Sequence, residues 1–285
     1  MTANPRDIAP AVVRRAYLDS RWGQTHVRIS GARGLGPPLL LLHPTPKSGW
    51  IYETLMGRLG HRCFAIAPDT PGYGASDPPA RPASIEDLAL AIMEAVTPLA
   101  PEGSVDVMGY HTGSVLAVAL SRLYPERVRR LVLTSLPAYD APTRAAKLEG
   151  LSSWPAPEIE GGHLGRLWSI MRARTHPALG ADWLHASFAE NLRPGRRGPW
   201  GYAAVYGYDL IAALPLIGRP TLVLNPEDDL HAVTAAHAAL IPGAAYMELP
   251  GARHGVFEHH AAEVAEIVTG FLASADRPET QSHPR

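Results

Sequence analysis

A glycine-framed pentapeptide between a strand pattern and a helix pattern constrains this chain more than any other feature. The pentapeptide at 109–113 reads Gly-Tyr-His-Thr-Gly. The run at 104–108 is typical of a short buried strand, and the run at 114–120 predicts a helix that ends before Pro125. Glycines two residues before and after the centre let a strand and a helix approach closely. The segment therefore predicts a strand, a sharp turn and a helix in succession.

The centre of this turn is His111, where the GxSxG nucleophile elbow carries a serine. A serine needs a base to remove its proton, whereas neutral imidazole is already a nucleophile near its ordinary pKa of about 6.5. Attack by His111 on an ester would give an acyl-imidazole, which water cleaves readily. A pair of histidines acting as general acid and base is the alternative chemistry.

The composition limits the classes of protein to which this chain can belong. The chain has 285 residues, 46% of them hydrophobic and 19% charged, which fits one enzyme-sized unit. A net charge of -1 gives no electrostatic footprint for nucleic acid or for an anionic membrane. The single cysteine, Cys63, excludes an intramolecular disulfide and lies in an apolar run typical of a buried structural thiol. The first 15 residues lack a signal-peptide core, so we expect a cytoplasmic protein.

Strand and helix patterns alternate along the chain, which predicts an α/β fold with a mostly parallel central sheet flanked by helices. The predicted strands are 38–43, 64–68, 104–108, 128–136, 221–225 and 245–249. The interval 137–216 has no strand pattern, but it shows helical spacing and holds four of the six tryptophans. We interpret it as an inserted helical cap in which Trp154 and Trp168 bind substrate. Packing of these aromatics into the insert's own small core is the alternative.

Three further motifs accompany the glycine frame. Residues 43–46 read His-Pro-Thr-Pro, residues 69–77 read DTPGYGASD, and residues 249–254 read LPGARH. Together they resemble the α/β-hydrolase-fold family of the capped type, the group of haloalkane dehalogenases, epoxide hydrolases and carbon–carbon bond hydrolases. The resemblance implies a core formed by 1–136 and 217–275 with the cap at 137–216. The polar residues 276–285 are expected to form a disordered tail. The 69–77 loop is expected to hold a tight turn and to carry no chemistry.

The resemblance also implies catalytic partners for His111. The 249–254 motif delivers His254 as the base, and the turn after the 221–225 strand places Asp229 as the acid. Asp228 lies beside it and is the open alternative. His259 and His260 follow in a segment typical of a helix and are expected to face solvent, and three histidines in the insert show no pairing: His163, His176 and His185.

An oxyanion site would need two N–H donors. The N–H of Thr112, directly after the elbow centre, is the first. Pro44 and Pro46 have no N–H to give, so Thr45 is the second. The alternative is that the two prolines only make the turn rigid. Tyr110 is expected to contact the substrate.

These residues predict an enzyme, a hydrolase of a small apolar or aromatic ester or other carbonyl compound. A cofactor-independent lyase or isomerase is the second interpretation, and a ligand-binding homologue without catalysis is the third. His111, His254 and Asp229 have the residue types of a two-histidine, one-carboxylate metal site, but their placement favours a hydrogen-bonded relay without metal. We expect no cofactor and a small-molecule substrate. Exposed aromatics of the insert would permit a homodimer.

Overall fold

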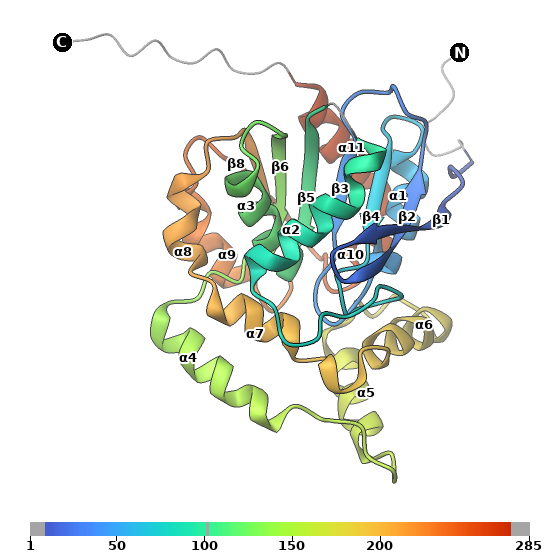
Figure 1. Ribbon diagram of the computed structural model, residues 1–285, viewed down its shortest axis with the longest axis vertical. Coiled ribbons are helices and arrows are strands. Elements are labelled where there is room, and N and C mark those ends of the chain that lie inside the picture. Colours follow the sequence, from blue (N-terminus) through green and yellow to red (C-terminus); the bar gives the residue numbers. More distant parts are fainter. Residues whose placement is uncertain (1–8, 101–102, 275–285) are drawn as a thin grey trace, which may run out of the picture.

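The protein is built around one twisted sheet of eight strands (Figure 1). The computed structural model describes residues 9–100 and 103–274, and the predicted tail at 276–285 lies outside them. The strand order is β1-β2-β4-β3-β5-β6-β7-β8. β2 runs antiparallel to β1 and β4, and the other pairings are parallel. The predicted α/β fold with a mostly parallel sheet is confirmed.

The elements alternate between strand and helix from β3 onward. The strands are β1 (Arg14–Ser20), β2 (Gly23–Ser30), β3 (Leu39–Leu42), β4 (Ala65–Pro68), β5 (Val105–Tyr110), β6 (Val128–Thr134), β7 (Thr221–Pro226) and β8 (Ala245–Leu249). The α-helices are α1 (Glu53–Leu59), α2 (Ile85–Val96), α3 (Thr112–Leu123), α4 (Ala141–Gly150), α5 (Gly162–Arg174), α6 (Ala181–Leu192), α7 (Trp200–Gly207), α8 (Leu210–Ala213), α9 (His231–His237), α10 (Val256–His259) and α11 (Ala261–Ala273).

The antiparallel pair β1 and β2 was not among the predicted strands. In β1 only alternate side chains are half-buried and the rest are exposed, because this strand is at the edge of the sheet. An edge strand buries little apolar surface, and its sequence therefore gives a weaker pattern than a central strand.

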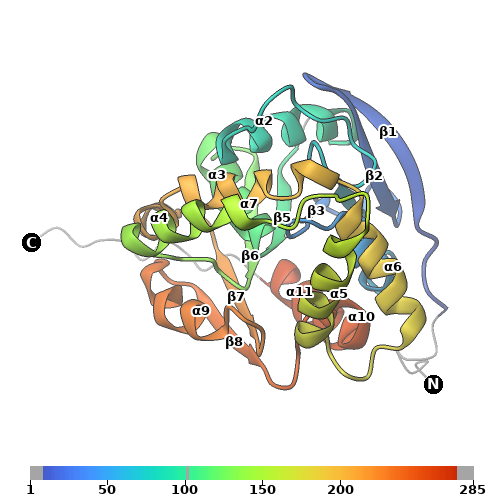
Figure 2. The same ribbon diagram turned by 90° about the horizontal axis from the view of Figure 1, so that it is seen from below.

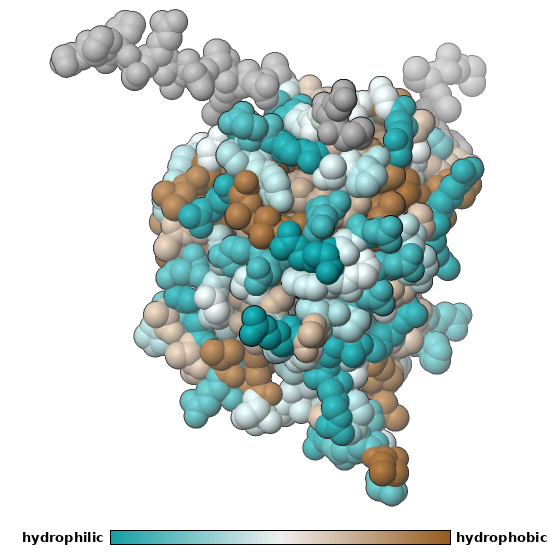
Figure 3. Space-filling model, in the orientation of Figure 1, coloured by the Kyte–Doolittle hydropathy of each residue, from teal (hydrophilic) through white to brown (hydrophobic). Residues whose placement is uncertain are grey.

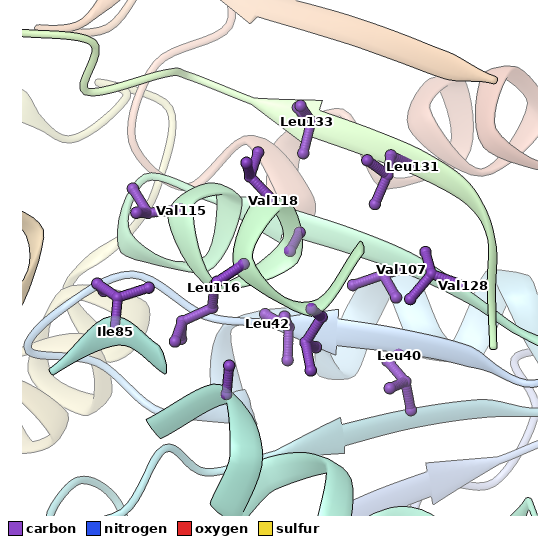
Figure 4. Close-up of a cluster of buried hydrophobic side chains, with 14 of the residues drawn as sticks. Leu40, Leu42, Ile85, Val107, Val115, Leu116, Val118, Val128, Leu131 and Leu133 are labelled. Atoms are coloured by element: carbon purple, nitrogen blue, oxygen red, sulfur yellow. The ribbon is translucent and has the colours of Figure 1, made fainter. Parts of the chain in front are cut away.

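One hydrophobic core fills the space between the sheet and helices α2 and α3 (Figure 4). In this view Leu116 and Val118 of α3 lie between Leu42 of β3 and Leu133 of β6. All four side chains are 0–1% exposed. This packing fixes the start of α3 directly after the end of β5.

A second core lies on the opposite face of the sheet. It joins β3, β4 and β7 to α1, α10 and α11. The rings of Tyr52 and Phe257 pack here with centroids 4.8 Å apart. Cys63 belongs to the same core, where burial raises the pKa of its thiol to about 12. A structural role for this cysteine agrees with the prediction.

Helices α4 to α7 lie across one end of the sheet, as Figures 1 and 2 both show. They occupy the interval between β6 and β7 that the sequence assigned to an inserted cap. The end of this interval is tied to the main body: Val205, Leu210 and Leu214 belong to the core cluster of α2 and α3. The helices before α7 therefore form the outer part of the insert.

The loop at 69–77 has the structural role expected of it. One oxygen of the Asp69 carboxylate accepts from the N–H of Gly49 at 2.8 Å, and the other accepts from the N–H of Ala75 at 3.0 Å. Ser76 donates to the Asp69 carbonyl at 2.7 Å. These bonds hold the turn through Gly72, whose φ is 88°.

The surface in Figure 3 mixes hydrophilic and hydrophobic residues, and the hydrophobic ones lie in small separate groups on the face shown. None of the helices in the described part of the chain combines the length and apolar character needed to cross a membrane.

Candidate active site

The sharp turn predicted at 109–113 is present between β5 and α3. Its central residue, His111, has φ 52° and ψ -114°, a conformation that costs a non-glycine residue about 1–3 kcal/mol. A methyl group on Gly109 would overlap the carbonyl oxygen of Gly113, and one on Gly113 would overlap that of Leu42. Both glycines are therefore required where strand, turn and helix meet.

His111 forms a hydrogen-bonded pair with Asp228. The distance from its Nε2 to Oδ2 of Asp228 is 2.9 Å. The same oxygen accepts from the hydroxyls of Tyr110 at 3.0 Å and Ser135 at 2.7 Å, and Oδ1 accepts from the N–H of Leu230 at 2.8 Å. Burial alone would raise the pKa of Asp228, but the neighbouring His111 outweighs it and the pKa is lowered to about 2. The carboxylate is therefore charged and fully hydrogen-bonded.

His254 forms a second pair with Asp229. Its Nε2 lies 2.7 Å from Oδ1 of Asp229, and Arg174 of α5 lies 3.4 Å from Oδ2. Burial opposes ionisation of Asp229, but the hydrogen bond from His254 and the nearby charges lower its pKa. Burial also lowers the pKa of His254 despite the carboxylate beside it. His254 is therefore a neutral base in the physiological range.

The two pairs face each other. The His111 and His254 rings have centroids 5.2 Å apart and planes inclined by 58°. Tyr110 lies beside both, with its ring centroid 4.3 Å from that of His111 and its hydroxyl 3.5 Å from Nδ1 of His254. Burial and the charge of Asp228 raise the pKa of Tyr110 well above its ordinary value. Its hydroxyl therefore stays protonated and serves as a donor to Asp228.

The sequence treated Asp228 and Asp229 as alternatives, whereas the structure gives each of them a histidine. Asp229 pairs with His254, as predicted. The partnership of Asp228 with His111 was missed because a triad needs only one acid. The signal was the adjacent pair of aspartates itself, together with a histidine at the elbow that requires a carboxylate of its own.

The two predicted oxyanion donors lie together, although one of them is engaged. The N–H of Thr45 donates to the hydroxyl of Thr112 at 3.3 Å, and the Thr45 carbonyl accepts from Tyr202 at 2.8 Å. Thr112 is the first residue of α3, so its own N–H has no acceptor within the helix. The oxyanion role of both Thr112 and Thr45 stays a prediction.

A cavity of about 390 Å³ opens above the two pairs. Tyr110, His111 and His254 line it from the core, and Trp154 lines it from the insert. Trp168 is not among its lining residues in the described chain, because its ring packs edge-to-face on Phe188 at 5.2 Å. Of the two tryptophans predicted to contact substrate, the structure brings only Trp154 to the site.

The cavity also contains a half-buried lysine that the sequence did not single out. Lys47 follows the two prolines after β3, and its Nζ donates to the carbonyl oxygen of Ser187 at 2.7 Å and also to the Ser187 hydroxyl. Burial lowers the pKa of Lys47 to about 7. This side chain therefore links the core loop to α6.

A backbone contact joins the insert to the loop that carries His254. Thr175 and His254 form an isolated parallel β-bridge, and the N–H of His176 donates to the His254 carbonyl at 3.0 Å. The segment after α5 is thus attached to the residue that completes the site.

The four site residues lie close enough to hold a metal ion, since one ligand atom from each of them is within 4.8 Å of the others. However, protein donors already engage Asp228 at both oxygens, and each histidine has a carboxylate partner. Protein partners therefore engage all four residues, and the relay without metal stays a prediction.

The glycine-framed turn, the cavity and the strand order define an α/β-hydrolase-fold protein. Residues 37–261 match the family model described as "alpha/beta hydrolase fold", and the chain belongs to this family. The predicted resemblance is confirmed.

Similar proteins are hydrolases of differing specificity. The chain is 26% identical over 255 residues to 2-(acetamidomethylene)succinate hydrolase of Mesorhizobium japonicum, covering 84% of this chain and 89% of that one. It is 26% identical over 273 residues to haloalkane dehalogenase 2 of Mycobacterium tuberculosis, covering 88% and 92%. The enol-lactonase of Burkholderia xenovorans LB400 shares the fold with a TM-score of 0.73 and 22% identity, over 91% of this chain and 100% of that one. The comparisons support a hydrolase in general.

Proposed function

We propose that the protein hydrolyses a small apolar or aromatic ester or related carbonyl compound, using His111 and His254. The observation that carries this proposal is the pair of histidine–aspartate dyads that face each other beneath one cavity. Family membership and the hydrolase relatives support the reaction class.

The protonation of each ring follows from its carboxylate partner. Asp228 is an acceptor, so Nε2 of neutral His111 carries the proton and Nδ1 keeps a lone pair. The same argument leaves Nδ1 of neutral His254 as a lone pair. Both imidazoles are therefore competent bases, and His111 has a nucleophilic nitrogen at the position of the elbow.

In the leading route, Nδ1 of His111 attacks the carbonyl carbon and displaces the alcohol, which takes a proton from water. His254 then removes a proton from a second water molecule, whose oxygen attacks the acyl carbon, and the bond to Nδ1 breaks to release the acid. The proton gained by His254 neutralises the hydroxide that remained when the first water protonated the alcohol. The N–H of Thr112 faces the developing negative charge, and the start of α3 adds a positive potential there.

The test is saturable hydrolysis of p-nitrophenyl acetate and p-nitrophenyl phenylacetate by the native protein and by the double variant His111→Ala/His254→Ala. We expect saturation with the native protein and only a slow, linear background with the double variant, because other imidazoles cleave such esters weakly. His185→Ala is the matched control, since this histidine is exposed on α6, and it should behave as the native protein. Equal rates for all three proteins would sink the proposal.

The roles of the two tryptophans can be separated by substitution. Trp154→Ala should raise KM for the aromatic ester about tenfold with little change in kcat, because it removes apolar cavity wall. Trp168→Ala should leave KM within about twofold and instead lower the free energy of unfolding by about 2 kcal/mol through loss of its contact with Phe188. Steady-state kinetics and urea unfolding of both variants provide the measurement. The assignment of Trp154 to the cavity wall and Trp168 to packing would be contradicted if Trp168→Ala raised KM and Trp154→Ala did not.

One feature favours a second candidate, a lyase or isomerase. Each histidine has its own carboxylate, and positive charge on His111 lowers the pKa of His254. Protonation of one ring therefore favours the neutral form of the other, as an acid and base pair requires. Incubation with small aromatic ketones in deuterated water tests it. Exchange at the carbon beside the carbonyl, abolished by His254→Ala, would support proton abstraction in place of hydrolysis.

A further inference from the structure

Three histidine rings meet where the insert contacts the core, next to the loop that carries His254. His176 follows α5, His259 ends α10, and His260 precedes α11. The His176 and His259 rings stack with centroids 4.0 Å apart, and the His260 ring lies 6.1 Å from the first and 5.1 Å from the second. The expectation that His176 has no pairing is therefore wrong. Its partners are 83 and 84 residues further along the chain.

We propose that His176, His259 and His260 bind one late first-row divalent transition metal ion, such as Zn²⁺, which fastens the insert to the core. One ligand nitrogen from each lies within 4.8 Å of the others. A tetrahedral zinc ion with bonds of about 2.0 Å places its ligands about 3.3 Å apart. Small side-chain rotations can bring the three nitrogens from their present separations to this distance. Three imidazoles without a carboxylate ligand suit zinc, cobalt or nickel better than calcium or magnesium.

His260 shows the strongest sign of a ligand. Its Nδ1 lies 3.0 Å from Oε2 of Glu263, one turn along α11. Its Nε2 is buried and has no hydrogen-bond partner among the described residues. A carboxylate on one nitrogen and a metal on the other is the usual arrangement of a metal-binding histidine. The metal ion would satisfy a buried nitrogen whose isolation otherwise costs about 1–3 kcal/mol.

The charges around the cluster set the conditions for binding. The guanidinium of Arg253 lies near enough for its charge to act on His176. Arg253 repels a cation, and Glu263 offsets that repulsion. The N–H of Ala178 donates to Nδ1 of His176 at 3.2 Å. Coordination through Nε2 therefore moves the ring proton to Nδ1 and breaks this contact.

The experiment uses the full-length protein after removal of metals with a chelator. Calorimetric titration with Zn²⁺ and visible absorption with Co²⁺ measure stoichiometry and coordination. We expect one equivalent to bind with a tetrahedral cobalt spectrum and to raise Tm by several degrees. His176→Ala and His259→Ala should each weaken affinity at least tenfold, and His185→Ala should leave it unchanged.

The four residues at the active site are a competing location, and a further variant separates the two. His111→Ala/His254→Ala removes both active-site imidazoles and should retain the tight site. Binding that survives in His176→Ala, or that is lost only in the double variant, would overturn the proposal. Because the readout is metal affinity, the result does not depend on whether the protein hydrolyses esters.

Discussion

Replacing Asp228 with asparagine is expected to lower kcat/KM for ester hydrolysis about a thousandfold, as expected for a carboxylate that orients a catalytic imidazole. Asp228 fixes the proton of His111 on Nε2. An amide that turns its NH₂ group toward this nitrogen would place the proton on Nδ1, where the lone pair is needed. The measurement is steady-state hydrolysis of p-nitrophenyl phenylacetate across pH 6 to 9.

Two further variants distinguish this role from a general loss of structure. Ser135→Ala removes one of the donors to Asp228 but keeps its charge, and should cost about tenfold or less. Asp229→Asn acts on the other histidine and should shift the pH profile of the acyl-imidazole cleavage step. If Asp228→Asn has a native Tm and retains rates within tenfold of the native protein, His111 does not depend on this carboxylate.

Replacing Lys47 with methionine should stabilise the protein, although it removes a side chain that crosses from core to insert. The pKa of Lys47 falls from 10.5 to about 7 because the ammonium group is buried. A depression of this size corresponds to about 4 kcal/mol of lost stability at neutral pH. Loss of the contacts with Ser187 offsets part of this gain. We expect a net increase of about 2 kcal/mol in the free energy of unfolding at pH 6.5.

The stabilisation expected from Lys47→Met depends on pH. Between the folded pKa near 7 and the unfolded value of 10.5, the unfolded chain binds more protons at Lys47, so native stability rises with pH. Below pH 7 both states are protonated and the contribution is constant. The gain in Lys47→Met should therefore shrink from pH 6.5 to 9.5 in urea unfolding. Lys147→Met is the control, and a loss of stability for Lys47→Met at both pH values would refute the argument.

The central sheet could be predicted from sequence because its strands are apolar throughout. Runs such as Leu39–Leu42 are buried on both faces, and this pattern is typical of a parallel strand covered by helices. The edge strand β1 escaped prediction because half of its side chains face solvent. The turn at His111 and the loop of His254 could also be predicted, since both are local features.

The remaining parts of the site depend on contacts between distant segments. The local sequence does not predict that Trp168 packs against Phe188, or that Lys47 contacts Ser187, 140 positions away. Likewise, the stacking of His176 on His259 exists only after the insert folds back on the core. A single sequence specifies these residues but does not show which of them become neighbours.

The hydrogen bond from His176 to the carbonyl of His254 has a consequence for turnover. Substrate entry or product release that lifts the segment after α5 must break this bond and release the loop of His254. One backbone contact thus couples the insert to the loop of His254, so a displacement of either segment is transmitted to the other.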